Sequence, residues 1–383
     1  MKLRRAALAA ACLLSAHSAW AGHYVFTDQG TGLTAHGIVP TPGQGFSPFW
    51  GGGAISWSDS LETTSDVWSG NVNDPVEHAD LLNGGTRTDL MPTGYSFAGT
   101  TNVEVFNNNS LVAGYAGTSV GGPTHAGLWT VPLVGGSPAF TDLHPAGYVS
   151  SLAQGLAGEY QVGWGRDGSQ LLHPLMWQST AASVSQLPLP TGMIQAAAAA
   201  IGRYIVGYGT GSDGISHPLW WVFGKHGTIT AYDLLPSNGT TGVAVATSNY
   251  QLAGSLQTTS TNGEWHAELF TGCPAECIDL HPGTIGKTSY IASSIYSMSS
   301  NGSSKYYFAG LAVVNNRKRT GHAMVWRWTN KNAPAPTPVD LQGTLGSGFT
   351  ASVATGVDGS GNVTGGALAT SGVWHQALWT YEN

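Results

Sequence analysis

Positive charge is scarce in this chain, and charge of either sign is uncommon. Its 383 residues contain 14 Lys and Arg against 21 Asp and Glu, a formal net charge of −7 at pH 7. Nucleic acids and anionic membrane surfaces are held by clustered Lys and Arg, so this balance argues against both as partners. Because only 9% of the residues are charged while 54 are glycines, we expect a fold rich in turns, with solubility resting on Ser, Thr, Asn and backbone groups.

Cysteine is also rare, with three in the whole chain. Two of them, Cys273 and Cys277, have three residues between them and are predicted to form a small disulfide that stiffens a loop. Free thiols and a metal site are the alternatives. A zinc site would need a second cluster of ligands, which is missing, so we expect no metal and no other cofactor.

No apolar run approaches the roughly 20 residues that a membrane-spanning helix needs. Residues 1–21 instead read as a secretory signal peptide, with a basic head, an apolar stretch from Ala6 to Ala16 and a cleavage site at Ala19-Trp20-Ala21. The mature chain would carry a net charge of −10, because Lys2, Arg4 and Arg5 are removed. We expect a secreted or periplasmic monomer, residues 22–383, forming a single domain. A lipid anchor through Cys12 is the alternative.

A short pattern recurs seven times, a His followed by Ala, Pro or Gln, any residue, an apolar residue and an aromatic or Leu. The copies are His78–Leu82, His125–Trp129, His173–Trp177, His217–Trp221, His266–Phe270, His322–Trp326 and His375–Trp379. Each copy lies in a longer unit with a preceding strand that ends in Gly. An Asp-Leu follows most copies, as at Asp142-Leu143, while the third unit has Gln186-Leu187 and the chain ends soon after the seventh copy. Four short strands with turn residues between them are typical of a propeller blade.

The predicted fold is therefore an all-β, seven-bladed β-propeller, with six or eight blades as fallbacks. The chain ends just after the third strand of its last unit, and Tyr24–Asp28 resembles the fourth strands of the other units. We expect the N-terminal strand to pair with the C-terminal blade and close the ring, because a closed ring has no free sheet edge.

These units resemble the HAF repeat, a pattern of probable extracellular bacterial proteins named for its His-Ala-Phe core. The resemblance is best over residues 99–177, with the Asn107 turn, Val112-Ala-Gly114, His125–Trp129 and Asp142-Leu143. It implies an extracellular setting and a repeat architecture, and it brings no established activity. This chain lacks the sorting tail of many members and replaces the Phe of the core.

Seven equivalent histidines could be read as metal ligands, but side chains spread around a ring do not converge on one point as the ligands of a metal ion must. We predict instead that the imidazole nitrogens satisfy backbone groups and so fix where each strand begins, while the aromatic four residues later packs between blades. Two other motifs are interpreted as loops. Gly117–Gly121 has the spacing of a hydrolase nucleophile elbow without a following helix, and Asp358–Asn362 lacks the later Glu of a calcium loop.

Function is expected where the repeats are interrupted, because loops on a rigid frame carry binding groups. The largest interruption, residues 39–66 in the first blade, is rich in aromatic and acidic residues, and its predicted ligand-binding residues are Trp50, Trp57, Asp59, Glu62 and Asp66. A plain structural cap is the alternative. The basic cluster Asn315–Arg319 is interpreted as a solvated hairpin tip or a site for an acidic partner.

The leading hypothesis is a non-enzymatic module that binds a glycan or an extracellular protein. The alternative is a carbohydrate-active enzyme, a glycosidase or polysaccharide lyase, with carboxylates drawn from Asp59, Glu62, Asp66 and Glu77. A purely structural envelope protein is the third possibility.

Overall fold

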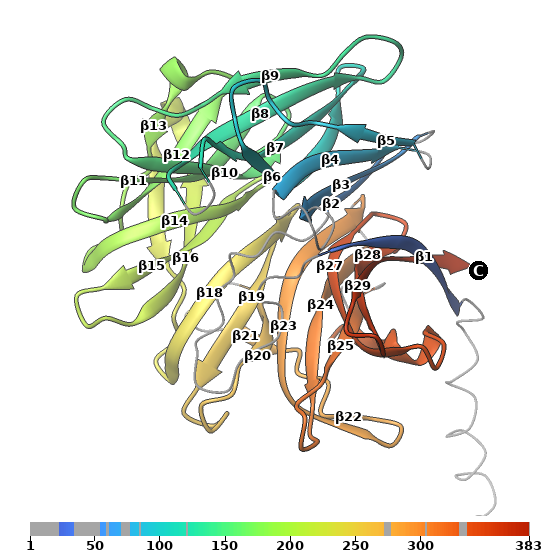
Figure 1. Cartoon of the computed structure of the whole chain (residues 1–383). Helices are drawn as coiled ribbons and strands as arrows, with labels where there is room; N and C mark the ends of the chain where they lie inside the picture. Colours follow the sequence, from blue (N-terminus) through green and yellow to red (C-terminus); the bar gives the residue numbers. More distant parts are fainter. Residues whose placement is uncertain are drawn as a thin grey trace, which may run out of the picture.

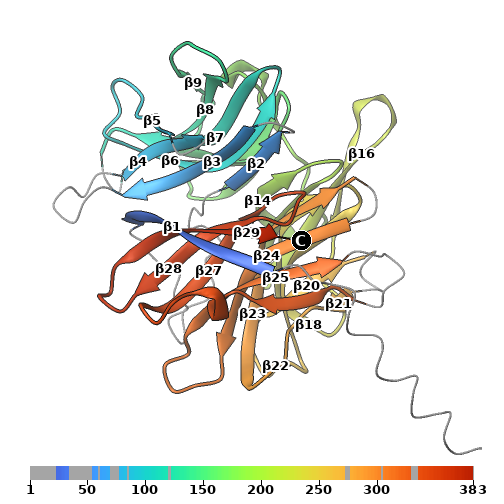
Figure 2. The same cartoon turned by 90° about the vertical axis from the view of Figure 1, so that its right-hand side faces the viewer.

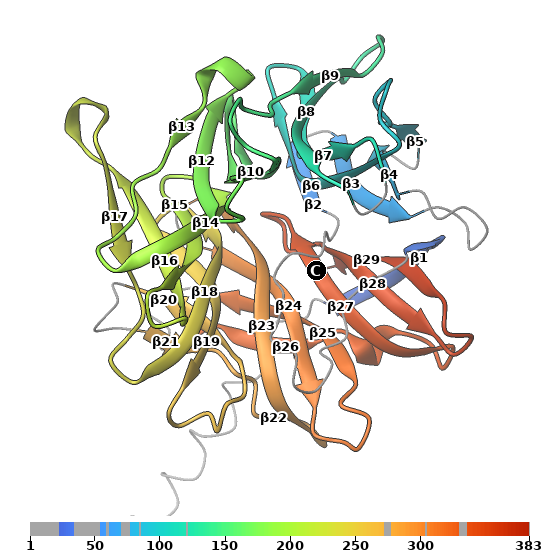
Figure 3. The same cartoon turned by 60° about the vertical axis from the view of Figure 1, so that its left-hand side comes forward.

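The computed structural model describes residues 23–33, 54–58, 61–69, 77–83, 86–119, 122–271, 277–302, 305–328 and 335–382. About 64% of the chain is strand and about 3% is helix. The strands pair into seven antiparallel sheets, which surround a central axis (Figures 1 and 3). The prediction of an all-β propeller is confirmed.

Six sheets are blades made of consecutive strands. Blade 1 holds β2 (Ala54–Ser58), β3 (Leu61–Ser69), β4 (Glu77–Asn83) and β5 (Thr86–Asp89); blade 2 holds β6 (Phe97–Phe106), β7 (Asn109–Gly117), β8 (Thr124–Pro132) and β9 (Ala139–Asp142). Blade 3 holds β10 (Ser150–Ala157), β11 (Tyr160–Arg166), β12 (Leu172–Gln178) and β13 (Ser185–Gln186); blade 4 holds β14 (Met193–Ile201), β15 (Ile205–Gly211), β16 (Ser216–Phe223) and β17 (Ile229–Asp233). Blade 5 holds β18 (Gly239–Ser248), β19 (Gln251–Thr258), β20 (His266–Phe270) and β21 (Cys277–Asp279). Blade 6 holds β22 (Thr284–Ile285), β23 (Thr288–Asn301), β24 (Lys305–Val314), β25 (Gly321–Trp328) and β26 (Thr337–Asp340). Short 3₁₀ helices span Ala181–Ser183, Lys225–Gly227 and Gln342–Thr344.

The seventh sheet, here called the closing sheet, joins the two ends of the chain. It consists of β27 (Phe349–Val357), β28 (Val363–Ala369), β29 (Trp374–Glu382) and, as its outer strand, β1 (His23–Leu33). The predicted pairing is observed, with Phe26 opposite Trp379 and Asp28 opposite Ala377, and Figure 2 shows β1 beside β29. The blade count is corrected from the predicted seven to six, because the last repeat has three strands of its own and its sheet depends on the N-terminus.

Each inner strand packs against the preceding blade, as β14 does against β11 and β12, and β18 against β15 and β16. The contact surface between two neighbouring blades is called a seam below. At the closing sheet β2 contacts β27 and β28, and β1 contacts β3. Among the described residues no helix has the length and apolar character required to span a membrane.

The repeated glycine does not end a strand, as the sequence had suggested, but lies inside the second strand of its sheet. The inner strand opposite carries a β-bulge, for example between Ala153 and Gly155 in blade 3. The bulge brings a carbonyl oxygen into the space of a side chain, so that a Cβ on Gly163 would lie 1.9 Å from the oxygen of Leu152. Only glycine fits there, which is the physical reason for its recurrence.

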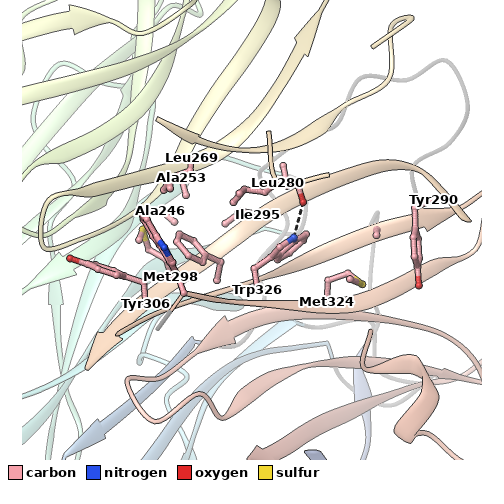
Figure 4. Close-up of a cluster of buried hydrophobic side chains, with 14 residues drawn as sticks. Ala246, Ala253, Leu269, Leu280, Tyr290, Ile295, Met298, Tyr306, Met324 and Trp326 are labelled. Atoms are coloured by element: carbon pink, nitrogen blue, oxygen red, sulfur yellow. Dashed lines mark hydrogen bonds between the residues drawn. The ribbon is translucent and has the colours of Figure 1, made fainter. Parts of the chain in front are cut away.

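The recurring aromatic residues form the core between blades. Trp129, Trp177, Trp221, Phe270, Trp326 and Trp379 are all at most 1% exposed. In blade 6 the indole N–H of Trp326 donates to the carbonyl oxygen of Leu280 in blade 5, at 2.8 Å (Figure 4). The predicted packing role of the aromatic residue is confirmed.

Candidate functional site

Each repeated histidine whose side chain the structure describes is hydrogen-bonded to an aspartate, usually that of the repeated Asp-Leu, and not to the backbone group that the sequence analysis predicted. The described pairs are His125 with Asp142 (2.9 Å), His217 with Asp233 (2.7 Å), His266 with Asp279 (2.8 Å), His322 with Asp340 (3.0 Å) and His375 with Asp28 (2.9 Å). In blade 3, where Gln186 replaces the aspartate, His173 turns to Asp167 at 2.9 Å. Outside blade 3 the pair thus joins the third and fourth strands of a sheet, and in the closing sheet the N-terminal Asp28 supplies the aspartate.

The same aspartate also shapes the turn into the next blade. In blade 6 one oxygen of Asp340 binds His322 while the other accepts the backbone N–H of Gln342 at 2.9 Å. The following residue, Leu341, is fully buried and donates its own N–H to the carbonyl of Ala323. The His–Asp pair is therefore part of the frame that positions the fourth strand.

Blades 2 and 5 add a second histidine to this frame. His144 stacks on His125, and His281 stacks on His266, each with ring centroids 4.0 Å apart. Each added histidine also approaches a serine of the next blade, with 3.0 Å between His281 Nδ1 and Ser293 Oγ.

A Ser–His contact could signal a nucleophile, but this serine is fully buried and its Oγ already accepts the N–H of Ala267 at 2.9 Å. The same arrangement occurs at Ser151 and His144. Because these Ser–His contacts are buried and recur in two blades, we interpret them as structural.

One side chain breaks this pattern in blade 5. Glu268 lies two residues after His266, where blade 2 has Gly127 and blade 6 has Met324. It is 4% exposed and sits directly opposite Asp279 in the pairing of β20 with β21. Directly opposed residues share one face of a sheet and have Cβ atoms about 4.5–5.5 Å apart, so the two carboxyl groups are close neighbours.

The environments of these two carboxyl groups separate their pKa values. Burial, with a smaller contribution from the charge of Asp279, raises the pKa of Glu268 to about 8. Burial also disfavours the charged form of Asp279, but hydrogen bonds from the His266 ring and the His281 amide outweigh it and lower the pKa of Asp279 below its usual value. At neutral pH Glu268 is therefore a protonated acid beside an ionised carboxylate.

The acid appears where the repeated tryptophan is missing. Five copies of the motif end in Trp, whereas the other two, His78–Leu82 and His266–Phe270, are the ones with a carboxylic acid at the third position, Asp80 and Glu268. In blades 2, 4 and 6 the indole N–H donates to a backbone carbonyl of the preceding blade. Phe270 has no such donor, so the seam between blades 4 and 5 differs from its neighbours.

Three of the five residues predicted to bind a ligand lie on described strands, and those strands belong to blade 1 and not to the blade of Glu268. Trp50 and Asp59 lie outside the described residues. Trp57 is on β2 and Glu62 and Asp66 are on β3, all in blade 1, with Trp57 opposite Glu62. Glu268, in blade 5, was not identified from the sequence, although its replacement of an apolar residue in the aligned repeats was a usable signal.

The remaining sequence-based predictions concern the cysteines and the basic cluster. Cys277 is disulfide-bonded at the start of β21, while Cys273 lies outside the described residues. Arg319 is not a solvated tip, because it makes a bidentate ion pair with Glu264 of the adjacent blade at 2.8 and 3.1 Å. Arg317 and Lys318 are exposed.

The loop interpretation of Asp358–Asn362 is confirmed, whereas Val120 and Gly121 of the Gly117–Gly121 motif lie outside the described residues. The Asp358 carboxylate accepts the N–H groups of Ser360 and Asn362, which makes that segment a hairpin turn. The stretch beginning at Gly117 leads into β8 at Thr124. In the described part of the chain no group of three or more His, Cys, Asp or Glu side chains is arranged to hold a metal ion.

No family model and no curated protein matches this chain. Solved structures do match. A crystal structure of puromycin hydrolase aligns over 91% of this chain and 54% of its own, with a TM-score of 0.56 and 10% identity. A puromycin-hydrolyzing peptidase of Mycobacterium tuberculosis aligns over 82% and 48%, with a TM-score of 0.50 and 11% identity.

The β-propeller domain of the Trilobed protease from Pyrococcus furiosus, described as having an open velcro topology, aligns over 87% of this chain and 96% of that domain, with a TM-score of 0.50 and 8% identity. The likeness is one of fold. This chain spans about half the length of the puromycin-hydrolysing proteins, and at such identity it shares their propeller and nothing is shown of their chemistry.

Proposed function

We propose that this chain is a carbohydrate-active enzyme, a glycosidase in which Glu268 is the general acid and Asp279 is the ionised carboxylate. One observation carries the proposal: Glu268 and Asp279 are opposed on paired strands, and their environments move their pKa values in opposite directions. A protonated and an ionised carboxyl group side by side are what glycosidic hydrolysis requires.

The strand pairing suits the mechanism that retains the configuration of the sugar. Retaining enzymes hold their two carboxyl groups about 5–5.5 Å apart, a separation that directly opposed strand residues can reach. Glu268 would give its proton to the glycosidic oxygen while Asp279 attacks the anomeric carbon, forming a glycosyl ester. Glu268, now ionised, would then take a proton from the water that cleaves this ester and restores both carboxyl groups.

This proposal replaces the non-enzymatic binding module that was the leading hypothesis from the sequence. It retains the second hypothesis, a carbohydrate-active enzyme, but moves the carboxylates from blade 1 to blade 5. The signal-like residues 1–21 and the resemblance to the HAF repeat support a setting outside the cytoplasm, where polysaccharides are abundant.

The test is product release from a panel of aryl glycosides and polysaccharides, with Glu268→Gln as the decisive variant. We expect wild-type protein to release reducing ends and kcat to fall by about 10²–10⁴-fold in Glu268→Gln, the usual contribution of a general acid. The activity of the wild type should decline above about pH 8, as Glu268 loses its proton.

Blade 2 provides a matched control, because Asp142, His125 and His144 repeat the frame of blade 5 without the acid. Asp142→Asn should leave kcat unchanged, whereas Asp279→Asn should abolish turnover. The competing role for Glu268 is structural, with its O–H replacing the missing indole donor. Since glutamine keeps a donor, an active Glu268→Gln protein, or a wild type inactive on the whole panel, would overturn the proposal.

A further inference from the structure

Blade 4 carries aromatic residues where the other repeats do not. At the fourth position of its motif stands Trp220, where the described copies elsewhere have Leu, Met or Val. The residue before its Asp-Leu is Tyr232, where blade 2 has Thr141 and blade 6 has Val339. The pairing of β16 with β17 sets Trp220 directly opposite Tyr232.

These residues belong to a continuous row of rings. Tyr232 contacts Trp220 with ring centroids 5.4 Å apart, Trp220 contacts Tyr204 at 5.2 Å, and Tyr204 contacts Tyr250 at 6.1 Å. The guanidinium carbon of Arg203 lies 4.4 Å from the Tyr250 ring centroid. We call these five residues the aromatic ladder. It bridges blades 4 and 5, which lie side by side in Figures 1 and 3.

The two ends of the ladder are open to solvent and its middle is anchored. Tyr232 is 47% exposed and Tyr250 is 58% exposed, whereas Trp220 and Tyr204 are half-buried against the core cluster of the seam that contains Phe270. A single exposed aromatic ring is ordinary, but a connected row of them indicates a binding surface.

The turn that presents Tyr250 is held rigidly. Asn249, with a φ of +52°, donates from its side-chain amide to Ser300 Oγ at 2.7 Å and to the Gly302 carbonyl at 2.6 Å, both in blade 6. These bonds order the turn without a ligand. A partner would therefore meet a surface already in its binding geometry, which lowers the entropic cost of association.

We infer that the aromatic ladder binds an acidic polysaccharide. Sugar rings pack their C–H faces on Tyr and Trp, whose hydroxyl and ring edges supply polar contacts. The exposed Arg203 adds a charged donor for a sugar carboxylate, and Lys225 lies in the β16–β17 turn at the same end of blade 4. Positive charge gathered here, in a chain with a net charge of −7, favours an anionic ligand over a neutral one.

The repeats supply a matched comparison for the charge. Blade 3 carries Gly158-Glu159-Tyr160 at the turn where blade 4 carries Gly202-Arg203-Tyr204. Tyr160 is 42% exposed, so it offers a similar ring with the opposite charge beside it. The ladder differs from this turn in its cation and in its row of further rings.

The experiment is affinity electrophoresis and calorimetry of the mature protein with polygalacturonate and alginate, with dextran as the neutral probe. We expect the wild type to bind both acidic polymers and to be unaffected by dextran. Tyr232→Ala with Tyr250→Ala should weaken binding about tenfold or more, the scale of losing two stacked rings. Arg203→Glu should abolish the preference for acidic polymers, and Tyr160→Ala should bind as the wild type.

Several results would overturn the inference: no binding of either acidic polymer, equal retardation by dextran, or undiminished binding by the ladder variants. Because the substituted rings are exposed, we expect each variant to keep the wild-type melting temperature. Thermal melting checks that the fold is intact. Binding is independent of the acid–base pair, so Glu268→Gln should bind as the wild type. Loss of turnover in Glu268→Gln with intact binding separates the two sites, and binding without any turnover would refute the proposed activity alone.

Discussion

The bond from an indole N–H to the preceding blade offers a direct measure of what holds the seams together. Trp326 donates to the Leu280 carbonyl at 2.8 Å, and both residues are buried, at 0% and 4% exposed. Trp326→Phe would remove the donor and leave that carbonyl unsatisfied, which costs about 1–3 kcal/mol. The smaller ring also loses buried area, and this second contribution has to be separated from the first.

Trp177 allows that separation, because its indole is as deeply buried but its N–H has no hydrogen-bond partner. Trp177→Phe therefore loses buried area but no hydrogen bond, and it removes a buried donor that has no partner. We expect Trp326→Phe to lower the free energy of unfolding by about 1–3 kcal/mol more than Trp177→Phe does. Urea denaturation followed by far-UV circular dichroism measures both, and equal destabilisation by the two substitutions would refute the reasoning. Trp177→Ala, which also empties the site, should cost about 3–5 kcal/mol.

Three further predictions follow from the charged groups and the closing sheet. The pKa of Glu268 is raised from 4.5 to about 8, so between these pH values the folded state keeps a proton that the unfolded chain releases. The free energy of unfolding should therefore fall as the pH rises from about 4.5 to 8. Glu268→Gln should remove this dependence and flatten the plot of melting temperature against pH. Burial of Asp340 opposes its ionisation, but hydrogen bonds from His322 and Tyr290 outweigh it and lower its pKa. Asp340→Asn should destabilise the fold by about 1–3 kcal/mol at pH 7, and the difference from the wild type should shrink as acid protonates Asp340. An unchanged melting temperature would contradict this. Deleting residues 23–33 should expose β29 as a free edge and produce oligomers in size-exclusion chromatography, whereas a monomer of wild-type stability would show that β1 is dispensable.

The repeat pattern predicted much of the fold because each of its positions has a structural requirement set by the same strand or by a strand that packs beside it. In blades 2–6 and in the closing sheet, the glycine of the second strand faces a bulged carbonyl, and the aromatic residue fills the space between two sheets. Because these requirements recur from sheet to sheet, they appear in the sequence as a periodic pattern. The partnership of His375 with Asp28 follows the same rule across the whole length of the chain.

The candidate site was much harder to predict. An acid at Glu268 is visible in the aligned repeats, but its protonation at neutral pH depends on burial and on the neighbouring Asp279, which only the folded sheet brings together. The predicted ligand-binding residues were chosen for their composition within one insertion. Composition indicates which chemistry is available and not which side chains converge.

By itself the sequence determined that this chain forms repeated four-stranded sheets and that its first strand can complete its last sheet, because strand periodicity, turn residues and the repeated Asp-Leu are properties of short segments. The tertiary structure alone decided that six blades are continuous, that Glu268 is buried opposite Asp279, and that four aromatic rings from two blades form one row. Burial, pKa and ring contacts arise from neighbours distant in sequence, and those neighbours exist only once the sheets have packed into a ring.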